Sequence, residues 1–166
     1  MRLRTGLVGA CVALGLLMLA TPPAAADVPA AITALSSANL YVDSSAGAVL
    51  DQSAASAALN SSIKIAVLPS SAGTAGTLAR QIGEAIGGKV TVGVFVGKTF
   101  DAQSNALCAG RASALAKKAV ADNLSQLKSD NDLTNTIKGF ASLVNSAGDC
   151  NAGSTGATSS GNRRPQ

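Results

Sequence analysis

The stretch "IKIAVLPSSAGTAGTLARQIGEAIGGKVTVGVFVG", residues 63–97, decides the fold. It begins with a mostly apolar run that a proline ends, which indicates a buried strand. Leu78, Ile82 and Ile86 then recur at every fourth position, as on one face of an amphipathic helix, and a pair of glycines closes this helix. The last part is rich in β-branched residues and predicts a second strand that helices cover on both faces. Within it, Gly93 indicates the close approach of a neighbour.

Alternating elements continue on both sides of this stretch. Toward the N-terminus, we predict a helix at residues 29–38, a strand at residues 39–43 and a helix that Asp51 caps. Toward the C-terminus, we predict a loop at residues 98–105, a helix of over twenty residues from about Asn105, and a last helix that ends at Gly148. This order predicts an α/β fold with a small, mostly parallel sheet, right-handed crossovers and helices on both faces as an α/β/α sandwich, ending in a helical hairpin.

The loop between the first strand of the stretch and its helix raises the question of a phosphate site. A P-loop requires Gly-x-x-x-x-Gly-Lys-Ser/Thr. If Gly73 is taken as the first glycine, the Gly-Lys-Ser/Thr positions hold Leu78, Ala79 and Arg80 instead. A dinucleotide loop requires Gly-x-Gly-x-x-Gly, and the chain has only Gly73 and Gly76. We therefore predict a connecting loop.

The N-terminus has the pattern of a secretory signal peptide. A basic start, "MRLR", precedes an apolar run at residues 6–20 and an A-x-A site that ends at Ala26. Cleavage after Ala26 leaves Asp27 as the first residue. The apolar run is shorter than the roughly 20 residues of a spanning helix. An N-terminal anchor, or a lipid attached to Cys11, is the alternative to a secreted or extracytoplasmic protein.

After the predicted signal peptide, residues 1–26, we expect a single domain at residues 27–150 and a disordered tail rich in Ser, Thr and Gly at residues 151–166. The sequence has 13 bases and 9 acids, and the loss of Arg2 and Arg4 leaves a net charge of +2. The bases are scattered and aromatic residues are 2% of the chain, so we expect no nucleic-acid partner. No second apolar stretch could span a bilayer, so a role at the membrane would require a partner. We expect an unknown protein partner at the envelope or outside.

The chain contains no histidine, which excludes Ser-His-Asp and Cys-His catalysis and histidine metal sites. In an exported chain, Cys108 and Cys150 are predicted to form a disulfide. Cys108 is expected in the first turn of the long helix, and Cys150 follows Gly148 by two residues. The open end of an antiparallel hairpin brings them within the about 7 Å that a disulfide requires. The C-x-x-C spacing of many redox and metal sites is absent.

Two aspartates are the candidate catalytic or metal-binding residues. Asp43 follows the first short strand, and Asp101 follows the third strand through the predicted loop, so both are expected at the carboxyl edge of the sheet, where α/β folds bind ligands. Together they could bind Ca²⁺, which prefers oxygen ligands. Alternatively, Asp43 caps the turn "DSSAG" and Asp101 caps the next helix, and the chain needs no cofactor.

The segments "LYVDSSAGAVLD", "IKIAVLPSS" and "AGTLARQIGEAIGGKVTVGVFVG" resemble the TPM-domain family, and small secreted or membrane-associated actinobacterial proteins of unknown function. The resemblance covers about residues 28–147 and includes Asp43, Gly47, Leu50 and Ala79. It implies a compact α/β/α sandwich outside the cytoplasmic membrane. Acid phosphatase activity and calcium binding are attributed to some members, and Asp43 is the functional acid that the resemblance carries over.

No catalytic signature emerges from the sequence. We therefore expect an exported, non-enzymatic α/β domain that acts as a binding or accessory module at the cell envelope or outside. One alternative is an acid-phosphatase-like or calcium-binding domain that uses Asp43 and Asp101. Another is a purely structural secreted protein.

Overall fold

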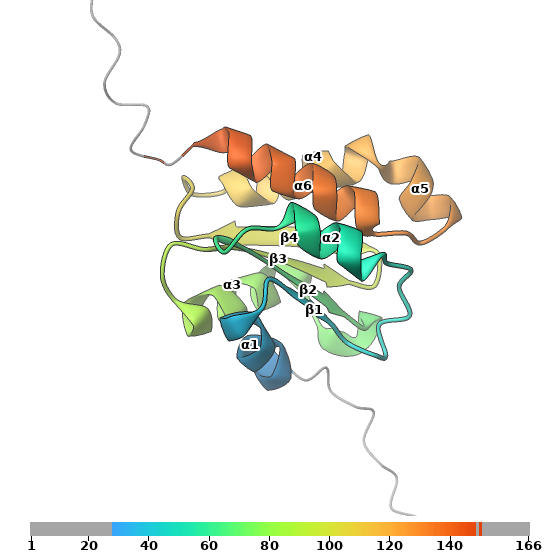
Figure 1. The fold of residues 1–166 in the computed structure, drawn as a ribbon, viewed down its shortest axis with the longest axis horizontal. Coiled ribbons are helices and arrows are strands. Elements are labelled where there is room, and N and C mark those ends of the chain that lie inside the picture. The colour runs from blue at the N-terminus through green and yellow to red at the C-terminus, as the bar shows by residue number, and fades with distance from the viewer. Residues whose placement is uncertain (1–27, 149, 151–166) are drawn as a thin grey trace, which may run out of the picture.

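Helices lie on both faces of a four-stranded sheet (Figure 1). The computed structural model describes residues 28–148 and 150. Along the chain, the elements are α1 (Val28–Ser37), β1 (Leu40–Val42), α2 (Gln52–Ala58), β2 (Ile63–Leu68), η1 (Ser70–Ala72), α3 (Ala75–Ile86), β3 (Thr91–Val96), β4 (Thr99–Ser104), α4 (Arg111–Asp122), α5 (Leu124–Ser129) and α6 (Thr134–Ala147). The predicted signal peptide with its cleavage site, and the predicted tail, lie outside the described residues.

The first three strands are parallel, as predicted. The strand order is β1-β2-β3-β4, and β4 runs antiparallel to β3. At the centre of the sheet, Ile65 pairs with Leu40 on one side and Gly93 on the other. β1 and β4 therefore form the two edges.

The strand β4 shows that the prediction of a loop at residues 98–105 is wrong. Its polar residues alternate with Phe100 and Ala102, which are buried, as in a strand with one face on the core. The chain enters β4 through a two-residue turn at Gly97, whose φ of 57° lies in the left-handed region that glycine adopts without strain. Such a turn joins antiparallel strands.

The two faces of the sheet have separate cores. α2, α4 and α6 pack on one face, and α1 and α3 pack on the other (Figure 1). β2 contributes to both, because successive side chains point to opposite faces: Ile63, Ile65 and Val67 to the first, Ala66 and Leu68 to the second. This double coverage explains why β2 and β3 consist mostly of apolar residues.

The connections through α2 and α3 do not both follow the predicted handedness. The chain steps in one direction across the sheet, from β1 to β2 and from β2 to β3. The connecting helices nevertheless lie on opposite faces. Two crossovers that step the same way over opposite faces have opposite hands, so one of them departs from the usual right-handed rule. The first connection differs from the second in that residues 43–51 precede its helix and that α2 packs against α6.

Lys64 is the polar exception within β2, with 7% of its surface exposed. Its Nζ donates to the carbonyl of Ala38 and to Oδ1 of Asn39, both at 2.9 Å. These acceptors lie just beyond the end of α1, where the helix dipole favours a cation. Burial lowers the pKa of the Lys64 ammonium.

All three phenylalanines of the chain pack together in the first core. Phe95 and Phe100 are cross-strand neighbours and stack with their ring centroids 4.1 Å apart. Phe140 of α6 meets Phe100 edge-on at 5.0 Å. The Phe100 ring also lies against Gly93, where a Cβ atom would be 2.8 Å from Phe100 Cε2 and 2.8 Å from Ile65 Cδ1. The predicted close approach at Gly93 is confirmed.

The helices after the sheet begin later than predicted. The expected start near Asn105 is wrong, because α4 begins at Arg111. The N–H groups of residues 106–107 donate to the Ser104 hydroxyl in a turn, and Gly110, with a left-handed φ of 75°, separates this turn from α4. Cys108 therefore precedes the helix and does not occupy its first turn.

The predicted long helix is two helices, α4 and α5, divided at Asn123. α6 packs against α4 and ends at Gly148. A disulfide joins Cys108 and Cys150, whose Cα atoms are 5.0 Å apart. It ties the turn before α4 to the end of α6. Within the part of the chain that the structure describes, no helix has the length and apolar character needed to cross a bilayer.

Candidate functional site

Asp43 lies directly after β1 and closes a turn. Its Oδ1 accepts the backbone N–H of Ser45 at 2.8 Å and also the Ser45 hydroxyl. The Ser45 hydroxyl, and then the Ser45 N–H, hold the pKa of Asp43 below its ordinary value, against a smaller opposing effect of burial. Asp43 has the geometry of the predicted turn cap, and it is held as a carboxylate, which does not suit a general acid.

Asp101 lies within β4, not in a loop. Its Oδ1 accepts the backbone N–H of Ala102 at 2.8 Å. Because β4 is an edge strand, a carboxylate that satisfies this N–H also obstructs pairing with another strand. Its Oδ2 lies 2.6 Å from the position that a Cβ atom would take at Gly76, in the first turn of α3. The prediction that Asp101 caps the next helix is wrong, because Gly110 occupies the N-cap of α4.

The structure does not bring Asp43 and Asp101 together. They belong to opposite edges of the sheet, three strand spacings or roughly 14 Å apart. Calcium ligands lie about 2.4 Å from the ion, so one ion cannot contact both carboxylates. Among the described residues, no group of three or more His, Cys, Asp or Glu residues could hold a metal ion.

The loop after β2 joins this strand to α3 through η1. A hollow of about 430 Å³ lies between this loop and the turn at Gly97, and its polar lining consists of Ser70, Thr74, Lys98 and Thr99. All four side chains are exposed, and within the described residues none of them makes a hydrogen bond. The hollow therefore lacks a polar group that the fold holds in place.

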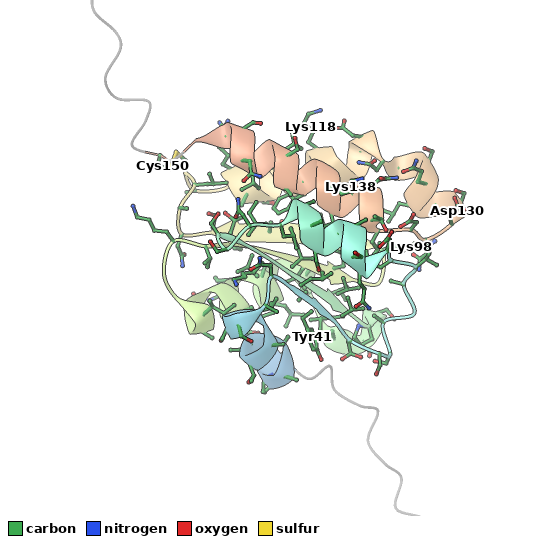
Figure 2. The ribbon with its side chains drawn as sticks, viewed as in Figure 1. Tyr41, Lys98, Lys118, Asp130, Lys138 and Cys150 are labelled. Atoms are coloured by element: carbon green, nitrogen blue, oxygen red, sulfur yellow. A yellow bond between two sulfur atoms is a disulfide. The ribbon has the colours of Figure 1, made fainter. Side chains whose placement is uncertain are left out.

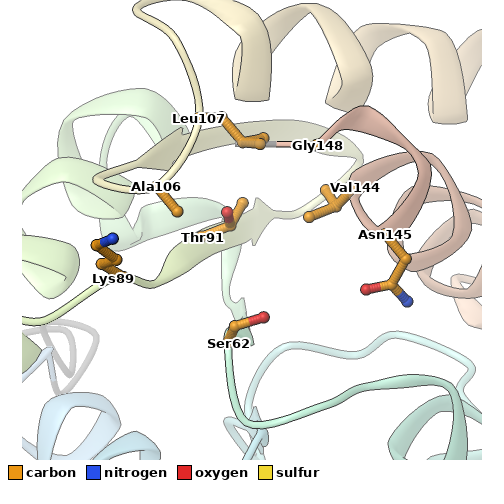
Figure 3. Close-up of a pocket in the computed structure, with 8 residues that line it drawn as sticks. All are labelled: Ser62, Lys89, Thr91, Ala106, Leu107, Val144, Asn145 and Gly148. Atoms are coloured by element: carbon orange, nitrogen blue, oxygen red, sulfur yellow. The ribbon is translucent and has the colours of Figure 1, made fainter. Parts of the chain in front are cut away.

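A pocket with fixed polar groups lies at the other end of the strands, where β2 and β3 begin and where β4 and α6 end (Figure 3). We call it the amino-edge pocket. Its volume is about 360 Å³, and it is lined by Ser62, Lys89, Thr91, Ala106, Leu107, Val144, Asn145 and Gly148. Cys150 lies on this side of the molecule, and Lys98 of the hollow described above lies on the opposite side (Figure 2).

Thr91 is the buried polar residue of the amino-edge pocket, with 2% of its surface exposed. Its Oγ1 lies 2.8 Å from Ser104 Oγ. Ser104 Oγ accepts the N–H groups of Ala106 and Leu107, both at 3.0 Å. Either hydroxyl can be the donor between Thr91 and Ser104, and Ser104 Oγ also lies 3.4 Å from the carbonyl oxygen of Val90, to which it can donate. Ser104 Oγ is thus the one hydrogen-bond partner of the Thr91 hydroxyl among the described residues.

Asn145 provides a second donor at the rim of the pocket. Its Oδ1 accepts from Nδ2 of Asn60 at 2.8 Å, which orients the amide and leaves Nδ2 of Asn145 as a donor. Asn60 Oδ1 in turn accepts the Ser62 hydroxyl at 2.7 Å. This chain of hydrogen bonds joins the segment before β2 to α6.

Lys89 is the charged residue among the described lining residues. Among the described residues, Arg80 and Lys118 form ion pairs along helix faces, with Glu84 at 3.1 Å and with Asp122 at 3.0 Å. Within the described residues, Lys89 makes no ion pair or hydrogen bond. The C-terminus of α6 also borders the pocket and carries about half a negative elementary charge. The full charge of the ammonium exceeds this, so the described lining has a net positive character.

The lining suits binding better than catalysis. Nucleophilic catalysis requires a hydroxyl or thiol within reach of a base that can take its proton. The Ser62 hydroxyl donates to the amide oxygen of Asn60, which is not a base. Cys108 and Cys150, near the rim, are joined in a disulfide. The described lining contains no carboxylate.

The sequence does not identify the amino-edge pocket. Thr91 and Ser104 are 13 residues apart, and Asn60 and Asn145 are 85 residues apart, so no local motif marks them. The predicted disulfide is the one feature of the sequence that indicates this pocket. It requires the segment before α4 to meet the end of α6, and these two segments form one wall of the pocket.

The chain matches no protein-family model, and neither a curated protein nor a solved structure matches it. The resemblance to TPM domains stays a prediction.

Proposed function

We propose that the chain is an exported α/β binding module that acts at the cell envelope or outside the cell, and that it holds its ligand in the amino-edge pocket. The observation that carries the proposal is the buried hydroxyl of Thr91 in the wall of this pocket, whose one hydrogen-bond partner among the described residues is Ser104 Oγ at 2.8 Å. A hydroxyl can make more than one hydrogen bond, so a ligand that adds a second bond to this buried group gains affinity. The pocket volume of about 360 Å³ falls within the range of small-molecule sites.

The disulfide between Cys108 and Cys150 supports export, because disulfides persist in oxidising compartments. The predicted signal peptide points the same way. Mass spectrometry of the chain that its host releases should find Asp27 at the N-terminus. A lipid-modified Cys11 would instead establish a membrane-anchored protein.

Site-specific photo-crosslinking in the native host tests the binding function. A photoreactive residue replaces Ser146, which is exposed beside Asn145 on α6. The matched control carries it at Gln81, which is exposed on α3, on the other side of the sheet. We expect an adduct from position 146 that excess unmodified protein suppresses, and none from position 81. Equal labelling at both positions, or no adduct at position 146, contradicts the proposal.

The phosphatase alternative is tested separately with a generic phosphomonoester. The binding proposal is wrong if the processed chain hydrolyses the ester and the Asp43→Asn variant abolishes hydrolysis without lowering the melting temperature. We expect no hydrolysis that depends on Asp43, because its Oδ1 is committed to Ser45 and its partner Asp101 lies at the opposite edge of the sheet.

A further inference from the structure

The hydrogen-bonding groups of the amino-edge pocket indicate which ligand it takes. We propose that the pocket binds a carboxylate carried on a short apolar substituent, an inference that rests on the binding function proposed above. Three side chains of the described lining carry a donor: the Thr91 hydroxyl, which pairs with Ser104 Oγ, and Nδ2 of Asn145 and the Lys89 ammonium, which have no acceptor among the described residues. Ser62 offers lone pairs, since its proton goes to Asn60. The ligand must therefore bring mainly acceptors.

The charge of the pocket favours a single negative charge. The Lys89 ammonium contributes one positive charge, and the C-terminus of α6 offsets about half of it. The two negative charges of a phosphate monoester would exceed the positive charge of the described lining, whereas the single charge of a carboxylate is closer to it. A carboxylate also has about four lone-pair sites and no donor, which suits the three donors of the lining. The apolar lining, formed by Ala106, Leu107 and Val144, provides room for a short apolar group.

The two uncharged donors are held in position before the ligand arrives. Ser104 fixes the Thr91 hydroxyl and is itself held by two backbone N–H groups. Asn60 fixes the Asn145 amide. Figure 3 shows Thr91 between Lys89 and Asn145. Because these groups need little ordering, most of their interaction energy is available for affinity.

A pair of probes of the same shape tests the ligand class. Isobutyramide has the shape of isobutyrate, but it is uncharged and has an NH₂ group in place of one carboxylate oxygen. This NH₂ group would meet the donors of the pocket. Each probe is titrated into the ¹⁵N-labelled chain as its host releases it. We expect isobutyrate to shift the amide signals of Thr91, Ala106 and Asn145 saturably, with a Kd on the order of 1 mM for so small a ligand. Isobutyramide should bind at least about ten-fold more weakly.

Substitutions at Thr91 separate hydrogen bonding from packing. Thr91→Val keeps the side-chain shape and removes the donor, so isobutyrate should bind about ten-fold more weakly. Thr91→Ser keeps the donor and should bind as the parent does. The matched control is Thr136→Val: Thr136 is also fully buried, and its Oγ1 has no partner, but it lies near the start of α6, away from the pocket. It should leave the Kd unchanged.

A second pair tests the charge. Lys89→Gln should weaken isobutyrate binding about ten-fold, whereas Lys138→Gln, at an exposed position on α6 outside the pocket, should not change it. A folded Thr91→Val variant with the parent Kd overturns the assignment of the donor. Equal binding of the two probes, or no saturable shift, overturns the carboxylate.

Two further comparisons separate the possible sources and failures. A short peptide with a free C-terminal valine identifies a polypeptide terminus as the source if it binds more tightly than isobutyrate, and its C-terminal amide should not bind. A position-146 adduct without an isobutyrate response overturns the carboxylate and leaves the binding function intact. An isobutyrate response without the adduct supports the carboxylate preference of the pocket and overturns the binding function in the native host.

Discussion

Replacing Gly93 with alanine puts a methyl group into a space that two side chains already fill. The new Cβ atom would lie 2.8 Å from Ile65 Cδ1 and 2.8 Å and 2.9 Å from two atoms of the Phe100 ring. Carbon atoms in contact prefer about 3.5–4.0 Å. The ring cannot move away without disturbing its stack on Phe95 or its edge contact with Phe140.

Two opposing effects set the magnitude of the Gly93→Ala change. Overpacking of a filled core costs about 1–3 kcal/mol, and contacts with two confined side chains place this site in the upper half of the range. Alanine in a strand recovers about 0.5–1 kcal/mol through the lower entropy of the unfolded chain. We therefore expect a net loss of about 1–2 kcal/mol in the free energy of unfolding, and a melting temperature roughly 5 °C lower.

Urea unfolding followed by far-UV circular dichroism measures the effect, and Gly83→Ala is the matched control. Gly83 is buried in α3, but a Cβ atom there would lie 3.6 Å from Val92 Cγ2, an ordinary contact. This variant should gain about 0.5–1 kcal/mol from helix propensity. Ile65→Val removes the atom that collides at Gly93, so the double variant with Gly93→Ala should lose less stability than the two single variants together. A Gly93→Ala protein as stable as the parent would refute the reasoning.

Three further predictions concern single contacts. Replacing Cys108 and Cys150 with serine should lower the free energy of unfolding in urea by about 4 kcal/mol on the chain-entropy model, given their separation of 42 residues; unchanged stability in the double variant contradicts this. Asp51→Ala should cost about 1 kcal/mol, because the N–H of Ala54 loses its acceptor at 2.9 Å, whereas Asp51→Asn should cost little; equal losses would argue against the cap. The lowered pKa of Asp43 means that its stabilisation is present above its ordinary value of 3.8 and is lost as the pH falls through the folded-state pKa. Thermal melts should therefore show the parent losing its advantage over Asp43→Asn as the pH falls below 3.8, and a constant gap would contradict the assignment.

The elements that the sequence predicts well have a complete local signal. β2 and β3 are mostly apolar runs and α3 has a clear helical periodicity, and a proline or glycine follows each of the three. Asp51 caps α2 as predicted, because N-capping depends only on residues three apart in the chain. Local chemistry of this kind needs no knowledge of the tertiary structure.

The predictions that are wrong depend on contacts between distant segments. β4 consists mostly of polar residues, and only its pairing with β3 and the burial of Phe100 make it a strand. The opposite hands of the two crossovers have no counterpart in any residue pattern. The amino-edge pocket was missed for the same reason, since its hydrogen bonds join residues far apart in the chain.

The topology of the sheet also explains why the pocket with fixed polar groups does not lie at the carboxyl edge, where the sequence places Asp43 and Asp101. In open α/β sheets, a ligand crevice forms where the strand order reverses. Here the order runs from β1 to β4 without a reversal, and a tight turn at Gly97 closes the carboxyl end of β3. At the amino edge, by contrast, the antiparallel β4 delivers Ser104 and the following turn to the point where α6 ends, and the disulfide holds these segments together. The antiparallel strand therefore adds Ser104 and its turn to the polar groups that the starts of β2 and β3 and the end of α6 already place at the amino edge.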